Sequence, residues 1–135
     1  MAHTERVADT RAHTGEGPLW HPDEERLYWV DIPAGRLFQY DPATDEYAVA
    51  YETDGAPIGG YTIESDGALL LFTRRRVERL VPGENETRLV TEIDAETRFN
   101  DVIADPSGRV FCGTMPGEDH LGDLFGEFTE RERVR

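Results

Sequence analysis

The amino-acid sequence predicts an all-β protein built from repeats that resemble propeller blades. Short apolar segments recur at close spacing, with turns rich in Gly, Pro and Asp between them. No long segment has the 3.6-residue apolar periodicity of a helix. A motif of about 40 residues also recurs, and a repeat of that size holding about four strands is typical of a propeller blade.

Ten segments have the composition of strands. The first two, 26–32 and 36–40, are rich in aromatic and β-branched residues, and a Pro-Ala-Gly turn separates them. A second turn at 41–45 leads into the next segment. The remaining expected strands are 46–51, 61–64, 68–72, 77–80, 87–92, 100–104 and 110–113, with a weaker candidate at 123–128.

The repeat is clearest in three turns. Segments 19–30, 63–72 and 103–112 each contain an apolar strand end, a turn with Asp or Pro, and a second apolar strand. Gly108 lies 41 residues after Gly67, and Glu25 lies 42 residues before Gly67. Coincidence between ordinary hairpins is the alternative, but three matching turns at nearly one spacing favour a true repeat.

The length limits how much of a propeller the chain can form. The smallest propellers have about four blades of roughly 40 residues. The 135 residues hold two blades and most of a third. We therefore expect residues 1–135 to be a single-domain fragment of a ring, either truncated, split or completed by oligomerisation.

The charge balance excludes several classes of partner. The chain has 28 Asp and Glu against 14 basic residues, all arginine, for a net charge of −14. Such a surface repels nucleic acid and anionic membranes. Abundant acid without lysine predicts adaptation to high salt, which screens carboxylate repulsion. The cluster of Arg74, Arg75 and Arg76 is interpreted as a hairpin turn, and the absence of a long apolar run predicts a soluble, cytoplasmic protein.

Oxygen donors are the main candidates for chemistry. Cys112 is predicted to be a small buried thiol, and His21 a solvated or capping residue in a turn, because the four histidines lack zinc spacing. Glu16 lies between two glycines, and Arg98, Asn100 and Asp101 lie together where a strand begins. Taken alone, a solvated carboxylate and turn-capping side chains explain these residues equally well.

Six segments in order strengthen the functional interpretation. They are 15–20 (GEGPLW), 27–32 (LYWVDI), 35–37 (GRL), 98–101 (RFND), 105–109 (DPSGR) and 113–115 (GTM). Together they resemble the senescence-marker-protein, gluconolactonase and luciferin-regenerating-enzyme-like family, which includes regucalcin. The resemblance runs from about residue 14 to residue 115.

The resemblance implies a six-bladed β-propeller that hydrolyses sugar lactones with a divalent metal, calcium or zinc. It implies that Glu16 and Asn100 hold the metal, that Arg98 and Asn100 bind substrate, and that Glu118 is a weaker match to an acidic substrate contact. Asp101 is expected to support the strand end. The predicted small-molecule partner is a sugar lactone.

The family's other metal ligands and its general base belong to later blades, so no catalytic residue can be assigned here. Residues 127–135 differ from a blade-like ending. A non-catalytic propeller fragment that binds calcium or a protein is the alternative function, and a C-terminal half of the propeller is a candidate partner. If the family interpretation holds, Glu16 and Asn100 should converge on one face.

Overall fold

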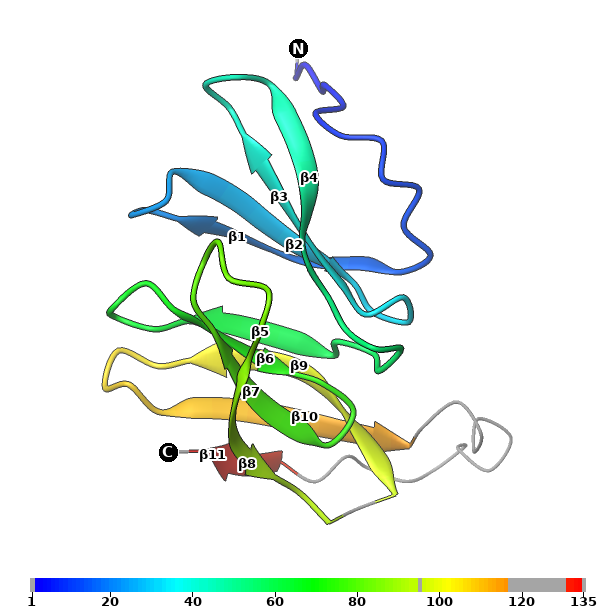
Figure 1. Cartoon of the computed structure of the whole chain (residues 1–135), viewed down its shortest axis with the longest axis vertical. Coiled ribbons are helices and arrows are strands. Elements are labelled where there is room, and N and C mark those ends of the chain that lie inside the picture. Colours follow the sequence, from blue (N-terminus) through cyan, green and yellow to red (C-terminus); the bar gives the residue numbers. More distant parts are fainter. Residues whose placement is uncertain (1, 95, 117–130, 135) are drawn as a thin grey trace.

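The computed structural model describes residues 2–94, 96–116 and 131–134, and strands are the only regular elements among them (Figure 1). The strands are β1 (Gly15–His21), β2 (Arg26–Asp31), β3 (Arg36–Asp41), β4 (Glu46–Glu52), β5 (Gly60–Ile63), β6 (Leu69–Phe72), β7 (Arg76–Leu80), β8 (Arg88–Glu92), β9 (Thr97–Ala104), β10 (Val110–Pro116) and β11 (Arg131–Val134). None of the described residues forms a helix that could cross a membrane.

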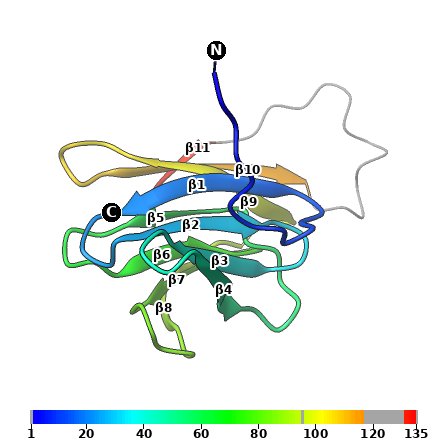
Figure 2. The same cartoon turned by 90° about the horizontal axis from the view of Figure 1, so that it is seen from above.

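The strands form three antiparallel sheets, which we call blades. Blade 1 has the order β1-β2-β3-β4, blade 2 the order β5-β6-β7-β8, and blade 3 the order β11-β10-β9. Figure 1 shows blade 1 above the other two blades, and Figure 2 shows the same strands from above. The strands of Trp29 and Phe72 are the second strands of blades 1 and 2, so the predicted all-β repeat is confirmed.

The three predicted turns adopt the same backbone conformation. Glu25, Gly67 and Gly108 all have positive φ, at 52°, 90° and 80°. In blades 2 and 3 the glycine N–H donates to the carbonyl three residues earlier, from Gly67 to Glu64 at 2.9 Å and from Gly108 to Asp105 at 3.0 Å. Bonds from backbone N–H groups also lower the pKa of the Asp66 and Asp105 carboxylates. The sequence repeat is therefore a repeat of one positive-φ turn position, and blades 2 and 3 also close the turn with the same hydrogen bond.

Strand β6 is buried on both faces. Leu69 and Leu71 belong to a core shared with blade 1, whereas Leu70 and Phe72 belong to a core shared with blade 3. Alternate side chains of a strand point to opposite faces, which explains this division. The Phe72 ring also meets Phe99 of blade 3 edge-on at 5.3 Å. Burying each such side chain stabilises the fold by about 1.5–3 kcal/mol.

Most expected strands form within one to three residues of their predicted bounds, and the exceptions lie at the two ends. Strand β1 begins at Gly15, so the glycine-flanked Glu16 lies in a strand and not in a loop. Within the 127–135 tail, β11 pairs with β10 as the third strand of blade 3. The weaker candidate at 123–128 lies outside the described residues.

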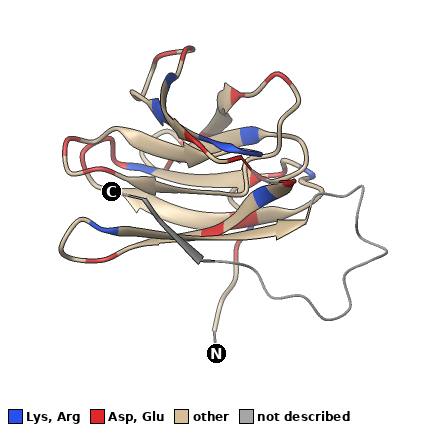
Figure 3. Cartoon of the chain, turned by 90° about the horizontal axis from the view of Figure 1, so that it is seen from below, with Lys and Arg blue, Asp and Glu red and all other residues tan. Residues whose placement is uncertain are grey.

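Many acidic residues lie in turns. Figure 3 shows acidic residues in turns at the ends of strands, and the sequence places three of them at 23–25. Residues 74 and 75 form the bend between β6 and β7, as predicted for the arginine cluster. Arg79 pairs with Glu64 at 2.7 Å and also with Asp66, which ties β7 to the turn before β6.

His21 is buried, and the expectation of a solvated histidine is wrong. Its side chain is 0% exposed at the end of β1. The ring Nδ1 accepts the Glu24 N–H at 3.1 Å, so it also caps its own turn. The ring is therefore the Nε2–H tautomer, which donates to the Gly67 carbonyl of blade 2 at 2.7 Å. This side chain joins the matching turns of two neighbouring blades.

We predict that His21→Ala lowers the free energy of unfolding by about 2–4 kcal/mol, because it leaves the buried Gly67 carbonyl without its donor and opens a cavity. Urea denaturation followed by circular dichroism measures the change. The control is His3→Ala, an exposed position, which should stay within about 0.5 kcal/mol of the wild type. Equal stability of both variants would contradict the inter-blade role.

Candidate functional site

We call the first strand of each blade, β1, β5 and β9, its innermost strand. All three innermost strands begin on one side of the molecule. Figure 1 shows the arrows of β1, β5 and β9 pointing the same way, and β5 lies against both β1 and β9. The first residues of these strands, Gly15, Gly60 and Thr97, therefore lie at the same edge of the stacked sheets. Glu16, Arg98 and Asn100 are all within four residues of such a strand start.

Glu16 lies beside a distortion of β1. The pairing register of β1 with β2 shifts between Glu16 and Leu19, and Gly17 has a φ of 66°. The Tyr61 hydroxyl of blade 2 donates to the Gly17 carbonyl at 2.6 Å. Burial raises the pKa of Tyr61, so its hydroxyl remains a donor at neutral pH. This bond fixes the backbone next to Glu16, whose own side chain is exposed.

Asp31 anchors the segment that leads into β1. This carboxylate is 5% exposed and accepts the backbone N–H groups of His13 and Thr14 at 3.1 and 2.9 Å. The Ile32 N–H donates in turn to the Thr14 carbonyl at 3.1 Å. Charged acceptors make strong hydrogen bonds, so the chain two residues before Glu16 is held on both sides.

A second distortion lies in β9. The register of β9 with β10 shifts so that Asp101 has no partner across the ladder, and its φ is 54°. Its N–H donates instead to the Gly59 carbonyl of blade 2 at 3.2 Å, so Asp101 ties the bulge within β9 to blade 2 and does not lie at a strand end. A Cβ on Gly59 would lie 1.8 Å from the Phe99 carbonyl oxygen, so only glycine allows this approach.

The structure brings Arg98 and Asn100 together. Both side chains are half-buried. Arg98 Nη1 donates to the Phe99 carbonyl at 3.0 Å and makes a long contact of 3.5 Å with Asn100 Oδ1. Arg98 also lines a small pocket with Thr14, which relates the start of β9 to the segment before β1. Glu118 lies outside the described residues.

The residues fit a hard cation only in part. Glu16 and Asn100 supply carboxylate and amide oxygens, the donors that calcium prefers, but calcium takes about six to eight oxygens. No three His, Cys, Asp or Glu side chains within 2–94 and 96–116 are grouped so that they could hold a metal. Glu16 and Asn100 lie on the first strands of blades 1 and 3, with β5 of blade 2 between these strands, so they amount to part of a site.

Three residues at this edge were not identified from the sequence: Asp31, Gly59 and Tyr61. Asp31 stands inside an ordinary strand pattern, and Tyr61 has the composition of a core residue. Only the Gly59-Gly60 pair before a strand carried a signal, since glycine there often marks close approach of two backbones.

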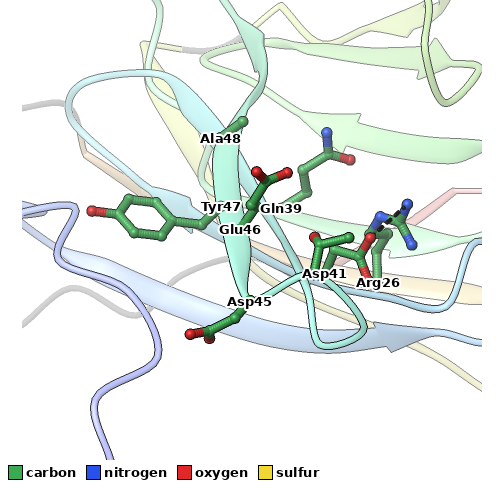
Figure 4. A pocket seen from close by; sticks show the side chains of 8 residues that line it. Arg26, Gln39, Asp41, Asp45, Glu46, Tyr47 and Ala48 are labelled. Carbon is green, nitrogen blue, oxygen red and sulfur yellow. Dashed lines mark ion pairs between the residues drawn. The ribbon is translucent and has the colours of Figure 1, made fainter.

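A separate hollow of about 510 Å³ lies at the hairpin between β3 and β4, which is the opposite end of blade 1 (Figure 4). Several of the charged groups there are already paired. Arg26 pairs with Asp41 at 3.1 Å, and Asp45 accepts the Tyr40 hydroxyl at 2.8 Å. This hollow is a feature of the hairpin and contains none of the predicted site residues.

Comparison with known proteins identifies the family of the chain. Residues 14–126 match the sequence profile described as "SMP-30/Gluconolactonase/LRE-like region". The chain belongs to this family. A pentonolactonase of Haloferax volcanii, XacC, is 55% identical over 121 residues, which cover 89% of this chain and 40% of that protein. Regucalcin of Gallus gallus is 32% identical over 117 residues, or 84% of this chain and 38% of that protein.

Solved structures of the family share the fold. A luciferin-regenerating enzyme superimposes with a TM-score of 0.69 at 23% identity, covering 82% of this chain and 38% of that one. A gluconolactonase from Xanthomonas campestris gives 0.68 at 18% identity, covering 92% and 44%. The chain thus spans about two fifths of the length of its relatives, and its three blades are the N-terminal part of their propeller.

We predict that Asp31→Ala frees the segment before β1, because two backbone N–H groups lose their acceptor. Hydrogen exchange at the His13 and Thr14 amides, followed by NMR, should accelerate at least about tenfold, as expected from losing about 1.5–3 kcal/mol of charge-assisted bonding. Asp54→Ala, an exposed position in the loop after β4, is the matched control. Unchanged exchange at His13 and Thr14 would show that Asp31 is not the anchor.

Proposed function

We propose that this chain carries the N-terminal part of a sugar-lactone hydrolase site. The observation that carries the proposal is the placement of Glu16, Arg98 and Asn100 at one edge of three neighbouring blades, in a chain 55% identical to a pentonolactonase. Glu16 and Asn100 are the proposed metal-holding residues, and Arg98 and Asn100 the proposed substrate contacts. Glu118 completes the proposed substrate contacts.

The chemistry follows from these side chains. A bound divalent cation, calcium or zinc, would supply Lewis-acid polarisation of the lactone carbonyl. Glu16 contributes a carboxylate and Asn100 an amide oxygen to its coordination. Arg98 presents a planar fork of donors that orients the ring oxygens and hydroxyls of a sugar. The general base is proposed to lie in blades beyond this chain, so the site here is incomplete.

A C-terminal half of the propeller is the proposed protein partner, and two apolar faces support it. On blade 3, Phe111 and Ile103 pair across β10 and β9 and are 38% and 69% exposed. The neighbouring Cys112 is buried in the core shared with blade 2. Since successive residues point to opposite faces, Phe111 and Ile103 lie on the face away from blade 2.

Blade 1 has a corresponding face at the other end of the stack. Trp20 pairs with Leu27 across β1 and β2 and is 50% exposed. Tyr28, which follows Leu27 and so points to the opposite face, is buried against blade 2. Trp20 therefore lies on the face away from blade 2. The remaining three fifths of the length of the relatives is the proposed cover for both faces.

A non-catalytic role is the second candidate. It is favoured by the lack of a three-ligand acidic or histidine cluster within 2–94 and 96–116. In that case the fragment would bind calcium weakly, or a protein partner, through the same edge. The two candidates differ in whether joining the missing blades produces lactone turnover.

We predict little or no hydrolysis of an aldonolactone by the isolated chain with calcium, zinc or manganese, because the site lacks ligands and a base. A chimera should restore turnover. It joins residues 14–116 to the remaining blades of the Haloferax volcanii pentonolactonase. Within that chimera, Glu16→Gln should reduce kcat/KM at least about 100-fold, because mutating a residue that only supports a metal ligand already costs about 10–100-fold.

The matched control in the chimera is Glu46→Gln, which removes an exposed carboxylate from β4 and should leave turnover unchanged. An inactive but folded chimera, or equal activity of the Glu16 and Glu46 variants, would contradict the proposed function. Robust metal-dependent turnover by the isolated chain would contradict its incompleteness.

We also propose that the chain is adapted to high salt and to the cytoplasm, on the support of its net charge of −14 and its lack of lysine. Molar potassium chloride shortens the Debye length to about 3 Å and screens repulsion among the turn carboxylates. We predict a melting temperature several degrees higher in molar potassium chloride than in dilute buffer, measured by differential scanning calorimetry. A melting temperature independent of salt would contradict the adaptation.

A further inference from the structure

A small pocket of about 190 Å³ lies at the edge where the innermost strands begin. Its lining comes from the segment before β1, the turn after β2, the linker before β5, the turn after β6 and the start of β9. In an antiparallel meander, these connections all lie at the end of the sheet where the first strand starts. The lining residues are His13, Thr14, Ile32, Pro33, Gly55, Pro57, Arg74 and Arg98.

The charge of this pocket is opposite to that of the chain. Its lining holds two arginines and a histidine but no Asp or Glu, although acidic residues outnumber arginines two to one in the sequence. Arg74 forms none of the ion pairs found among the described residues. Arginine recognises carboxylates through parallel N–H donors, so two arginines that line one pocket favour an anion of that geometry.

The backbone holds the two arginines next to each other. The Phe99 N–H donates to the Arg74 carbonyl at 3.1 Å, which ties the turn after β6 to the residue following Arg98. Arg98 Nη1 donates to the Phe99 carbonyl at 3.0 Å, which fixes the direction of that side chain. Ile32 and Pro57 are buried and give the pocket an apolar wall. Such a mixed lining suits a small molecule with both carbon chain and charge.

We propose that this pocket binds the carboxylate of an open-chain sugar acid, with Arg74 as a specificity-determining residue. The inference rests on the proposed function. Hydrolysis of a lactone adds water across the acyl C–O bond, which frees a hydroxyl on one carbon and a carboxylic acid on the other. At neutral pH the acid loses its proton, so the product carries a charge that the lactone lacks. The pocket next to Arg98 is placed to hold that charge.

Titration calorimetry of the 135-residue chain with gluconate tests the proposal at constant ionic strength. Gluconate should bind, and sorbitol, a neutral chain of the same carbon number, should not. Arg74→Gln should weaken gluconate binding at least about tenfold, because it removes a charged hydrogen-bonding partner. The matched control is Arg75→Gln, which removes the same charge one residue away and outside this pocket, and which should change the Kd less than twofold.

Arg74→Lys keeps the charge and the fold but loses the planar fork, so it should also weaken gluconate binding. Circular dichroism establishes that each variant is folded. No binding of gluconate to the wild type, equal losses in the Arg74 and Arg75 variants, or sorbitol binding as tight as gluconate would each overturn the proposal. Sulfate binding with the affinity of gluconate would show a general anion site and overturn it as well.

The outcome can be separated from that of the proposed function. If gluconate binding depends on Arg74 but the chimera is inactive, the carboxylate pocket is supported and the lactonase function is contradicted. If the chimera is active but Arg74→Gln does not change its inhibition by gluconate, the carboxylate pocket is contradicted and the lactonase function is supported.

Discussion

The packing of both faces of β6 is the interaction on which the rest of the structure depends. Four consecutive residues, Leu69–Phe72, are buried, and they alternate between the core shared with blade 1 and the core shared with blade 3. A strand can be buried in this way only if a sheet lies on each side of it. Blade 2 therefore orients its two neighbours, and with them the edges where the innermost strands begin.

The candidate site follows from that stacking. Because blade 2 contacts both neighbours, its own residues fix the two distorted strands that carry the functional side chains. Tyr61 bonds to the backbone beside Glu16, and Gly59 accepts the N–H of Asp101 beside Asn100. Bulges re-aim side chains and interrupt strand pairing, which is why they recur near functional sites. Blade 2 contributes positioning here, whereas blades 1 and 3 contribute the oxygen donors.

The partial ring and the charge distribution are connected. An open array exposes apolar residues such as Trp20 and Ile103 at its two ends, in a chain that otherwise covers its turns with acid. Against that acidic surface, the pocket lined by Arg74 and Arg98 is an exception in charge. The acidic surface repels anions, whereas arginine guanidinium groups bind carboxylates. A small anion would therefore find favourable contacts in this pocket.

Local chemistry was enough to predict the strands, the repeated turns and the ordered family motifs, because alternation, turn residues and motif order are properties of neighbouring positions. The same reasoning identified Glu16, Arg98 and Asn100 as candidates. It failed for His21 and for the strand character of residues 15–18, because burial and strand pairing depend on the neighbouring blade and strand. Only the tertiary structure could place Arg74 near Arg98, because the bond from the Phe99 N–H to the Arg74 carbonyl connects the two blades across a long sequence distance.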